Sequence, residues 1–91
     1  MIAILLIAAG CGTSPPVQEM SDARQAIAAA KEAGAEQTAA EDIRAAEAYL
    51  DSAQRKLTER AYAQARRDAL QAKSKALAAL ATTESSDDDP R

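Results

Sequence analysis

The segment AYAQARRDALQAKSKALAAL, residues 61–80, decides the fold of this 91-residue chain. Its small or aromatic residues recur at alternating steps of three and four, in the row Tyr62, Ala65, Ala69, Ala72, Ala76 and Ala79. The row is flanked by Leu70, Leu77 and Leu80. This spacing places the row on one side of an α-helix, and its alanine side chains let neighbouring helices approach closely.

The same spacing occurs in the two segments that precede this one. The first row is Met20, Ala23, Ile27, Ala30 and Gly34, and the second is Ala39, Ile43, Ala46, Leu50, Ala53 and Leu57. From residue 17 to residue 81 the chain contains no proline, one glycine and mostly strong helix formers. We therefore expect an all-α domain over residues 17–81. It consists of three antiparallel helices, an N-terminal helix plus a helical hairpin, packed along alanine-rich rows that we call seams.

The first helix is bounded by residues that favour helix ends. Pro15 and Pro16 suit its start, and Gly34 is the residue expected just past its end. Thr38 and Glu41 have the spacing of a capping box, which predicts that Thr38 caps the second helix.

The boundary between the second and third helices is less marked, because residues 57–60 contain neither glycine nor proline. Two arrangements are open: one helix continues through this segment, or the chain turns tightly at residues 58–60. We favour the tight turn, which gives helices of similar length joined by short loops.

The N-terminal segment resembles the export signal of a bacterial lipoprotein. Residues 2–9 are apolar and uncharged, but a helix of this length spans only about 12 Å, too short to cross a bilayer. Ala8, Ala9 and Gly10 precede Cys11, as in the lipobox at which lipoprotein signal peptidase cleaves. The resemblance implies that residues 1–10 are a signal peptide, that cleavage falls between Gly10 and Cys11, and that Cys11 is lipidated. The alternative is a buried N-terminal segment with an unreactive cysteine.

The segments on either side of the helical domain are expected to be unstructured. Residues 11–16 contain glycine, serine and proline and are expected to form a flexible tether. Gly12 follows the lipidation position, where an aspartate retains lipoproteins of enteric type in the inner membrane, so its presence predicts the outer membrane. Residues 82–91 are polar and acidic and are expected to form a disordered tail.

The composition argues against an enzyme. The chain has no histidine and one cysteine, so the usual general base near neutral pH and a ligand set for structural zinc are both missing. Its carboxylates are expected on exposed helix faces, where no burial raises their pKa. We expect no catalytic, cofactor-binding or metal-binding residues, and no cofactor.

Charge is divided along the chain. Residues 19–51 carry three basic and eight acidic side chains, whereas residues 55–75 carry seven basic and two acidic ones. The basic set is Arg55, Lys56, Arg60, Arg66, Arg67, Lys73 and Lys75. The division favours packing of the basic segment against the acidic one, within a molecule or between copies. The alternative is an ordinary solvated surface with helical pairs such as Asp51–Arg55. The chain has only two aromatic side chains for stacking and a pI near 4.8, so the basic set does not predict nucleic-acid binding. Anionic cell-wall polymers or lipid headgroups are the better candidates for this set.

Large apolar side chains are scarce in this chain. From Cys11 onward, 81 residues include only eight leucine, isoleucine and valine residues. Alanine buries little area per side chain, so a single copy has a small apolar core. We therefore expect stability to depend on self-association or on a partner.

The stretch from Glu19 to Ala81 resembles a small, alanine-rich helical lipoprotein domain that is catalogued as a domain of unknown function. The matching segments are residues 23–35, AEAYL at residues 46–50 and AYAQA at residues 61–65. That family occurs in Gram-negative bacteria, sometimes joined to an outer-membrane-protein-A-like domain that binds peptidoglycan. The resemblance implies a helical domain of the cell envelope and supplies no catalytic residues.

Together these features predict a non-enzymatic protein of the cell envelope, anchored in the outer membrane through lipidated Cys11 and facing the periplasm. Its expected role is structural or in assembly. The expected partners are the membrane, further copies of the chain or another envelope protein, with peptidoglycan nearby and no nucleic acid. The alternative is a helical adaptor or chaperone-like module that binds a partner protein in a groove.

Overall fold

A computed structural model describes residues 14–88, which form four helices: α1 (Val17–Glu32), α2 (Ala35–Thr38), α3 (Ala40–Thr58) and α4 (Tyr62–Asp88). No strand occurs among these residues, so the all-α class is confirmed. The expectation of three helices is correct for the long ones, but it missed the single turn of α2.

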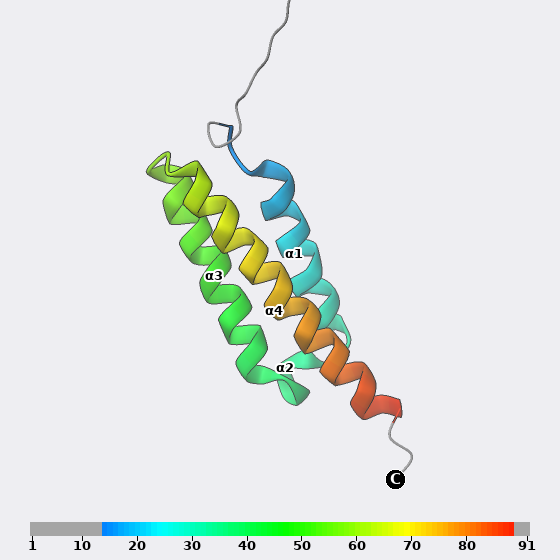
Figure 1. Ribbon diagram of the computed structural model, residues 1–91. Helices are drawn as coiled ribbons and strands as arrows, with labels where there is room; N and C mark the ends of the chain where they lie inside the picture. Colours follow the sequence, from blue (N-terminus) through cyan, green and yellow to red (C-terminus); the bar gives the residue numbers. More distant parts are fainter. Residues whose placement is uncertain (1–13, 89–91) are drawn as a thin grey trace, which may run out of the picture.

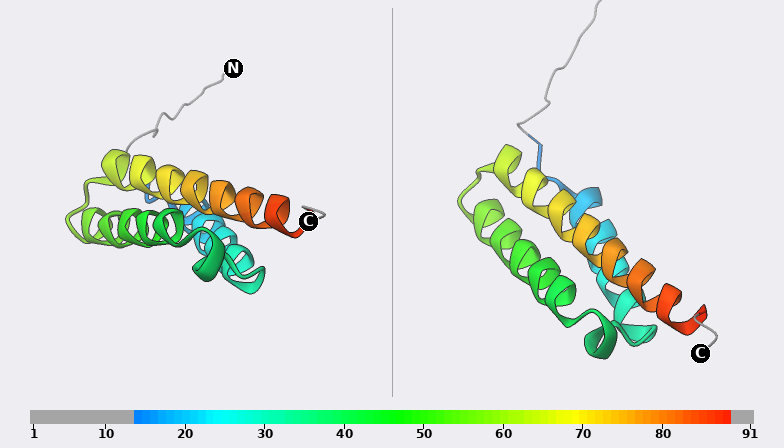
Figure 2. Two further views of the ribbon diagram at one scale, coloured as in Figure 1. Left: turned by 90° about the horizontal axis from the view of Figure 1, so that it is seen from below. Right: turned by 60° about the horizontal axis from the view of Figure 1, so that its bottom comes forward.

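The three long helices form an up-down-up arrangement (Figure 1). Helices α3 and α4 make the expected antiparallel hairpin. Helix α1 is antiparallel to α3 but runs parallel to α4. Helix α4 packs extensively against both α1 and α3, which contact each other much less. Figure 2 shows α4 lying over the pair from one side.

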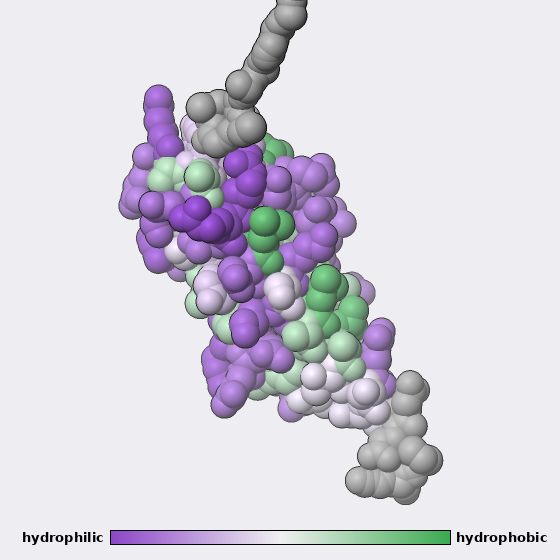
Figure 3. All heavy atoms as spheres, in the orientation of Figure 1, coloured by the Kyte–Doolittle hydropathy of each residue, from purple (hydrophilic) through white to green (hydrophobic). Residues whose placement is uncertain are grey.

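The alanine seam of α4 faces this pair. Its five alanines at positions 65, 69, 72, 76 and 79 are completely buried, as the spacing predicted. Because these side chains are single methyl groups, the α4 backbone lies close to both neighbours. Leu70 and Leu77, which flank the seam, keep 50% and 46% of their surface exposed because they lie on the outer side of α4. Figure 3 shows patches of hydrophobic surface on the side where α4 lies.

The core consists of three layers along the bundle, and each contains one large buried side chain among alanines. The first layer contains Met20, Ala53 and Ala69, and the second contains Ile27 and Ala76. Ile43 belongs to the third layer, which contains Ala79. Leu50 and Leu57, expected in the second seam, pack against these layers but remain partly exposed. The large side chains therefore come mainly from α1 and α3, and α4 supplies the space for them.

The first connection is longer than predicted. Gly34 follows the end of α1 with φ +97°, the left-handed conformation that glycine adopts at low cost, as expected. The prediction that Thr38 caps the next helix is wrong, since Thr38 is the last residue of α2 and Ala39 is the N-cap of α3. The reason is a local competition: the Thr38 hydroxyl donates to the carbonyl of Gly34 within α2 instead of reaching forward.

Thr38 also explains why α4 is longer than predicted. Its oxygen also accepts a hydrogen bond from the hydroxyl of Thr83, a side chain that is only 1% exposed and lies within hydrogen-bonding distance of the Ala79 carbonyl. This contact holds α4 in helical form beyond Ala81. The expectation of a disordered tail is therefore wrong for residues 82–88, and residues 89–91 lie outside the described part of the chain.

The second connection is the tight turn that we favoured. Helix α3 ends at Thr58, and Arg60 has φ +63°. The amide of Arg60 donates to the Leu57 carbonyl, and that of Ala61 donates to Lys56, at 3.0 and 2.8 Å. This is the hydrogen-bond pattern of a Schellman motif, in which an arginine occupies the position that glycine usually takes.

The buried seam predicts that a larger side chain on α4 destabilises the bundle. Ala76→Leu is expected to lower the free energy of unfolding by about 1–3 kcal/mol, because no space exists beside Ile27 and Ala46. Ala78→Leu is the matched control, since Ala78 is exposed on the same helix, and a change within about 0.5 kcal/mol is expected. Urea unfolding followed by circular dichroism measures both. Equal losses of unfolding free energy in the two variants would contradict the close approach of α4 to α1 and α3.

Candidate functional site

The predicted lipidation residue Cys11 and the cleavage residue Gly10 lie outside residues 14–88, so the structure does not describe them. The described chain nearest to them is the segment Ser14–Pro16, which joins α1 at the end of the bundle where α3 turns into α4 (Figure 1). We call this the tether end: residues 14–17, the last turn of α3 from residue 55, the turn at 59–61, and α4 to residue 67.

Arg66 of α4 holds the entering chain at the tether end. Its Nη2 donates to the carbonyl of Ser14 at 3.1 Å, and its Nε donates to Oε2 of Glu19 at 3.3 Å. Pro16 is fully buried, and its carbonyl accepts from the amide of Met20. Residues 14–16, expected as part of a flexible tether, are therefore packed against the bundle. No local pattern could have identified this contact, because 52 positions separate Arg66 from Ser14.

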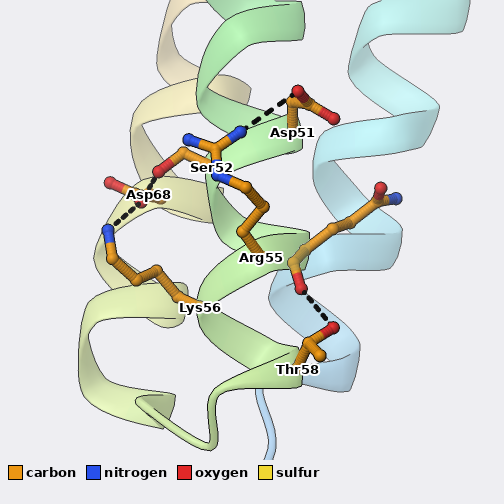
Figure 4. Close-up of polar contacts among 7 residues, drawn as sticks. Asp51, Ser52, Arg55, Lys56, Thr58 and Asp68 are labelled. Atoms are coloured by element: carbon orange, nitrogen blue, oxygen red, sulfur yellow. Dashed lines mark hydrogen bonds and ion pairs between the residues drawn. The ribbon is translucent and has the colours of Figure 1, made fainter.

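Two further cations of the basic set are engaged by carboxylates of α3 and α4 (Figure 4). The predicted pair Asp51–Arg55 is present at 3.3 Å, on the exposed face of α3. Lys56 lies 4.0 Å from Asp68, which also accepts a 2.6 Å hydrogen bond from Ser52. Pairs as exposed as Asp51–Arg55 contribute little to stability, whereas the Ser52–Asp68 contact helps to fix α4 against α3.

Arg60 and Arg67 differ from Arg55, Lys56 and Arg66 in having no carboxylate partner among the described residues. Both are exposed, and neither forms an ion pair within residues 14–88. The carboxylates of Glu19, Asp51 and Asp68 at or near this end are each matched by a cation, which leaves Glu59 as the exposed acid nearby. The tether end therefore presents a small excess of positive charge.

A second feature is a groove between α1 and α3, on which α4 does not lie. Its volume is about 630 Å³, and its lining residues are Arg24, Ile27, Ala28, Lys31, Glu47, Ala48, Leu50, Asp51 and Gln54. The floor is apolar and the rims are charged. We call it the α1–α3 groove. Because the groove is open to solvent, it suits a segment of another protein better than a buried small molecule.

Lys31 and Glu47 form an ion pair across the α1–α3 groove. The pKa of Lys31 is raised above its ordinary value, first because the ammonium donates a hydrogen bond to Glu47 and then because that carboxylate attracts it. Because this pKa is raised, the ammonium of Lys31 stays protonated through the neutral range, and its contribution to the ion pair is lost as the pH rises through that pKa.

Among residues 14–86, whose side chains the structure describes, no cluster of three or more acidic, histidine or cysteine side chains has the arrangement of a metal site. Over residues 14–88, no helix is both long enough and apolar enough to cross a membrane.

Comparison with known proteins identifies the family of the chain. The model of a family described as a domain of unknown function (DUF4398) matches residues 18–89, which include all four helices except the first residue of α1. The comparisons with curated proteins and with solved structures found no match.

The contacts of Arg66 generate a prediction with a neighbouring control. Arg66→Gln is expected to lower the free energy of unfolding by about 1 kcal/mol, because it removes both contacts with the entering chain. It should also speed amide hydrogen exchange near the start of α1. Arg67→Gln removes the same charge from an exposed position and should leave both quantities unchanged. If the two variants exchanged equally fast there, Arg66 would not hold the segment.

Proposed function

This chain belongs to the DUF4398 family of domains of unknown function, and we propose that it is a non-enzymatic, lipid-anchored protein of the bacterial cell envelope. In this proposal Cys11 carries a lipid that is inserted in the outer membrane, and the helical bundle faces the periplasm. Its role there is structural or in the assembly of other envelope components.

The observation that carries the proposal is the short distance along the chain between Cys11 and the bundle. The sequence places small residues before Cys11, and Ser14, which contacts the bundle, follows only three positions later. Arg66 binds the Ser14 carbonyl, so the bundle is joined closely to the proposed anchor. Several acyl chains on one cysteine supply durable anchoring, since each buried methylene contributes about 0.8 kcal/mol.

The outer-membrane location rests on Gly12, because the aspartate that retains enteric lipoproteins in the inner membrane is absent there. A protein anchored in the inner leaflet of that membrane lies near peptidoglycan. We therefore propose both the outer-membrane location and the proximity to peptidoglycan.

The proposed assembly role rests on the α1–α3 groove. Its apolar floor and charged rims offer one face of two helices to a third helix, from another copy of the chain or from an envelope protein. The scarcity of large side chains in the core favours such association, since each of the three layers has one large buried residue. The same groove favours the second candidate function, a helical adaptor or chaperone-like module without an essential anchor.

Metabolic labelling tests the anchor. When the gene is expressed in a Gram-negative host with radioactive palmitate, the wild-type chain is expected to incorporate label because Cys11 accepts acyl chains. Cys11→Ser is expected to lose the label and to keep the uncleaved N-terminal segment. Absence of label in the wild-type chain, at equal expression, would refute the lipid-anchored function and leave the adaptor.

Cross-linking in intact cells tests the groove. A photoreactive phenylalanine derivative in place of Ala48, which is exposed in the α1–α3 groove, is expected to capture a partner. The same derivative at Ala78, exposed on α4, is the control and should capture much less. The mass of the adduct distinguishes a second copy from another envelope protein. Equal yields at the two positions would show that the groove is not the binding surface.

A further inference from the structure

We propose that the tether end of the bundle rests on the membrane surface, with Arg60 and Arg67 in contact with anionic lipid headgroups. This inference deepens the proposed function and rests on an anchor at Cys11. It assigns an orientation to the bundle: the α3–α4 turn faces the lipid, and α2 and the end of α4 point away from it.

The first step is the reach of the chain. Cys11 and Ser14 are three residues apart, and even a fully extended chain spans no more than about 3.6 Å per residue, so Ser14 lies within about 11 Å of Cys11. Because acyl chains on Cys11 are buried in the hydrocarbon, Cys11 itself lies at its boundary. Ser14 is thereby confined to the headgroup region or just outside it.

The second step is that the bundle cannot pivot freely about Ser14. Arg66 binds the Ser14 carbonyl, Pro16 is buried, and α1 begins at the next residue. The position of Ser14 therefore sets the position of the rest of the tether end, to which Arg66 joins it. A proline pair at positions 15 and 16 further restricts the entering backbone.

The third step is the charge at the two ends of the bundle. At the tether end, Arg60 and Arg67 are exposed with no ion pair within residues 14–88, and Glu59 is the exposed acid beside them. The opposite end is acidic: Glu41 and Glu84 are exposed, and Glu36, also exposed, lies 3.7 Å from Lys31. An anionic surface attracts the first end and repels the second within a Debye length of about 8 Å.

The fourth step is the chemistry of the residues at the tip. Arg60 occupies the left-handed position of the turn with φ +63°, and its exposed side chain forms no ion pair with the side chains that the structure describes. Arginine presents a planar fork of donors that matches two phosphate oxygens at once. Val17, which is 70% exposed at the same end, adds an apolar side chain that suits the headgroup boundary. Headgroup phosphate is therefore the chemistry that this surface fits.

Tryptophan fluorescence tests the orientation, because the chain contains no tryptophan of its own. The chain from Cys11 onward keeps every residue that the structure describes, and its single thiol can be coupled to a maleimide lipid in vesicles. Gln64→Trp reports on the tether end and Gln37→Trp on the opposite end, since both positions are exposed. The vesicles contain phosphatidylcholine with a minority of phosphatidylglycerol, and a nitroxide on some headgroups serves as the quencher.

We expect quenching at position 64 to exceed that at position 37 by about twofold or more, as for a bundle held mainly in one orientation. The double variant Arg60→Gln/Arg67→Gln is expected to reduce this difference. The charge-matched control Arg44→Gln/Lys75→Gln removes two cations that lie outside both the tether end and the α1–α3 groove, and it should preserve the difference. Salt at about 1 M, where the Debye length is about 3 Å, should act like the first double variant.

Equal quenching at the two positions would overturn the orientation, and so would equal effects of the two double variants. Circular dichroism of every variant checks that the helices persist. Because the coupling supplies the lipid, the result does not depend on acylation in the cell. Quenching as expected without palmitate incorporation would support the surface while refuting the proposed anchor, and palmitate incorporation without the quenching difference would overturn the surface alone.

Discussion

The close approach of α4 to α1 and α3 is the constraint on which the rest of the structure depends. Five alanines along one side of α4 are completely buried, and each presents only a methyl group to its neighbours. Met20, Ile27 and Ile43 can therefore contact the α4 surface directly, one in each core layer. Dispersion contacts weaken steeply with separation, so a bundle with so few large side chains depends on this short spacing.

Two left-handed residues direct α1, α3 and α4 into this arrangement, and they do so at different cost. Gly34 has no Cβ, whereas Arg60 adopts φ +63° with a full side chain, a conformation that costs roughly 1–2 kcal/mol. Arg60 forms no ion pair with the described side chains of the bundle. The charge at the tip of the turn is therefore available to something outside the bundle, which connects the local backbone to the proposed contact with headgroups.

The two ends of the bundle differ in what they offer. The tether end holds the entering chain through Arg66 and presents unpaired arginines, whereas the other end joins α2 to α4 through Thr38 and Thr83 and is acidic at its surface. Between them, the α1–α3 groove leaves one face of the helix pair open. A proposed anchor at one end and an open groove along the side are compatible, because a partner in the groove does not compete with the membrane at the tether end.

Local rules were sufficient to predict the helical class, the alanine seam of α4, the glycine after α1 and the turn after Thr58. Helix propensity and the spacing of small residues are properties of neighbouring positions, so the sequence alone determines them. The tertiary structure decided what depends on residues distant in the chain. Thr38 bonds to Thr83 across 45 positions, which extends α4 past the predicted end, and Arg66 holds Ser14, which orders part of the predicted tether. Spacing on one helix cannot specify which side a second helix covers. For this reason the exposure of Leu70 and the open groove became evident only when the helices were packed together.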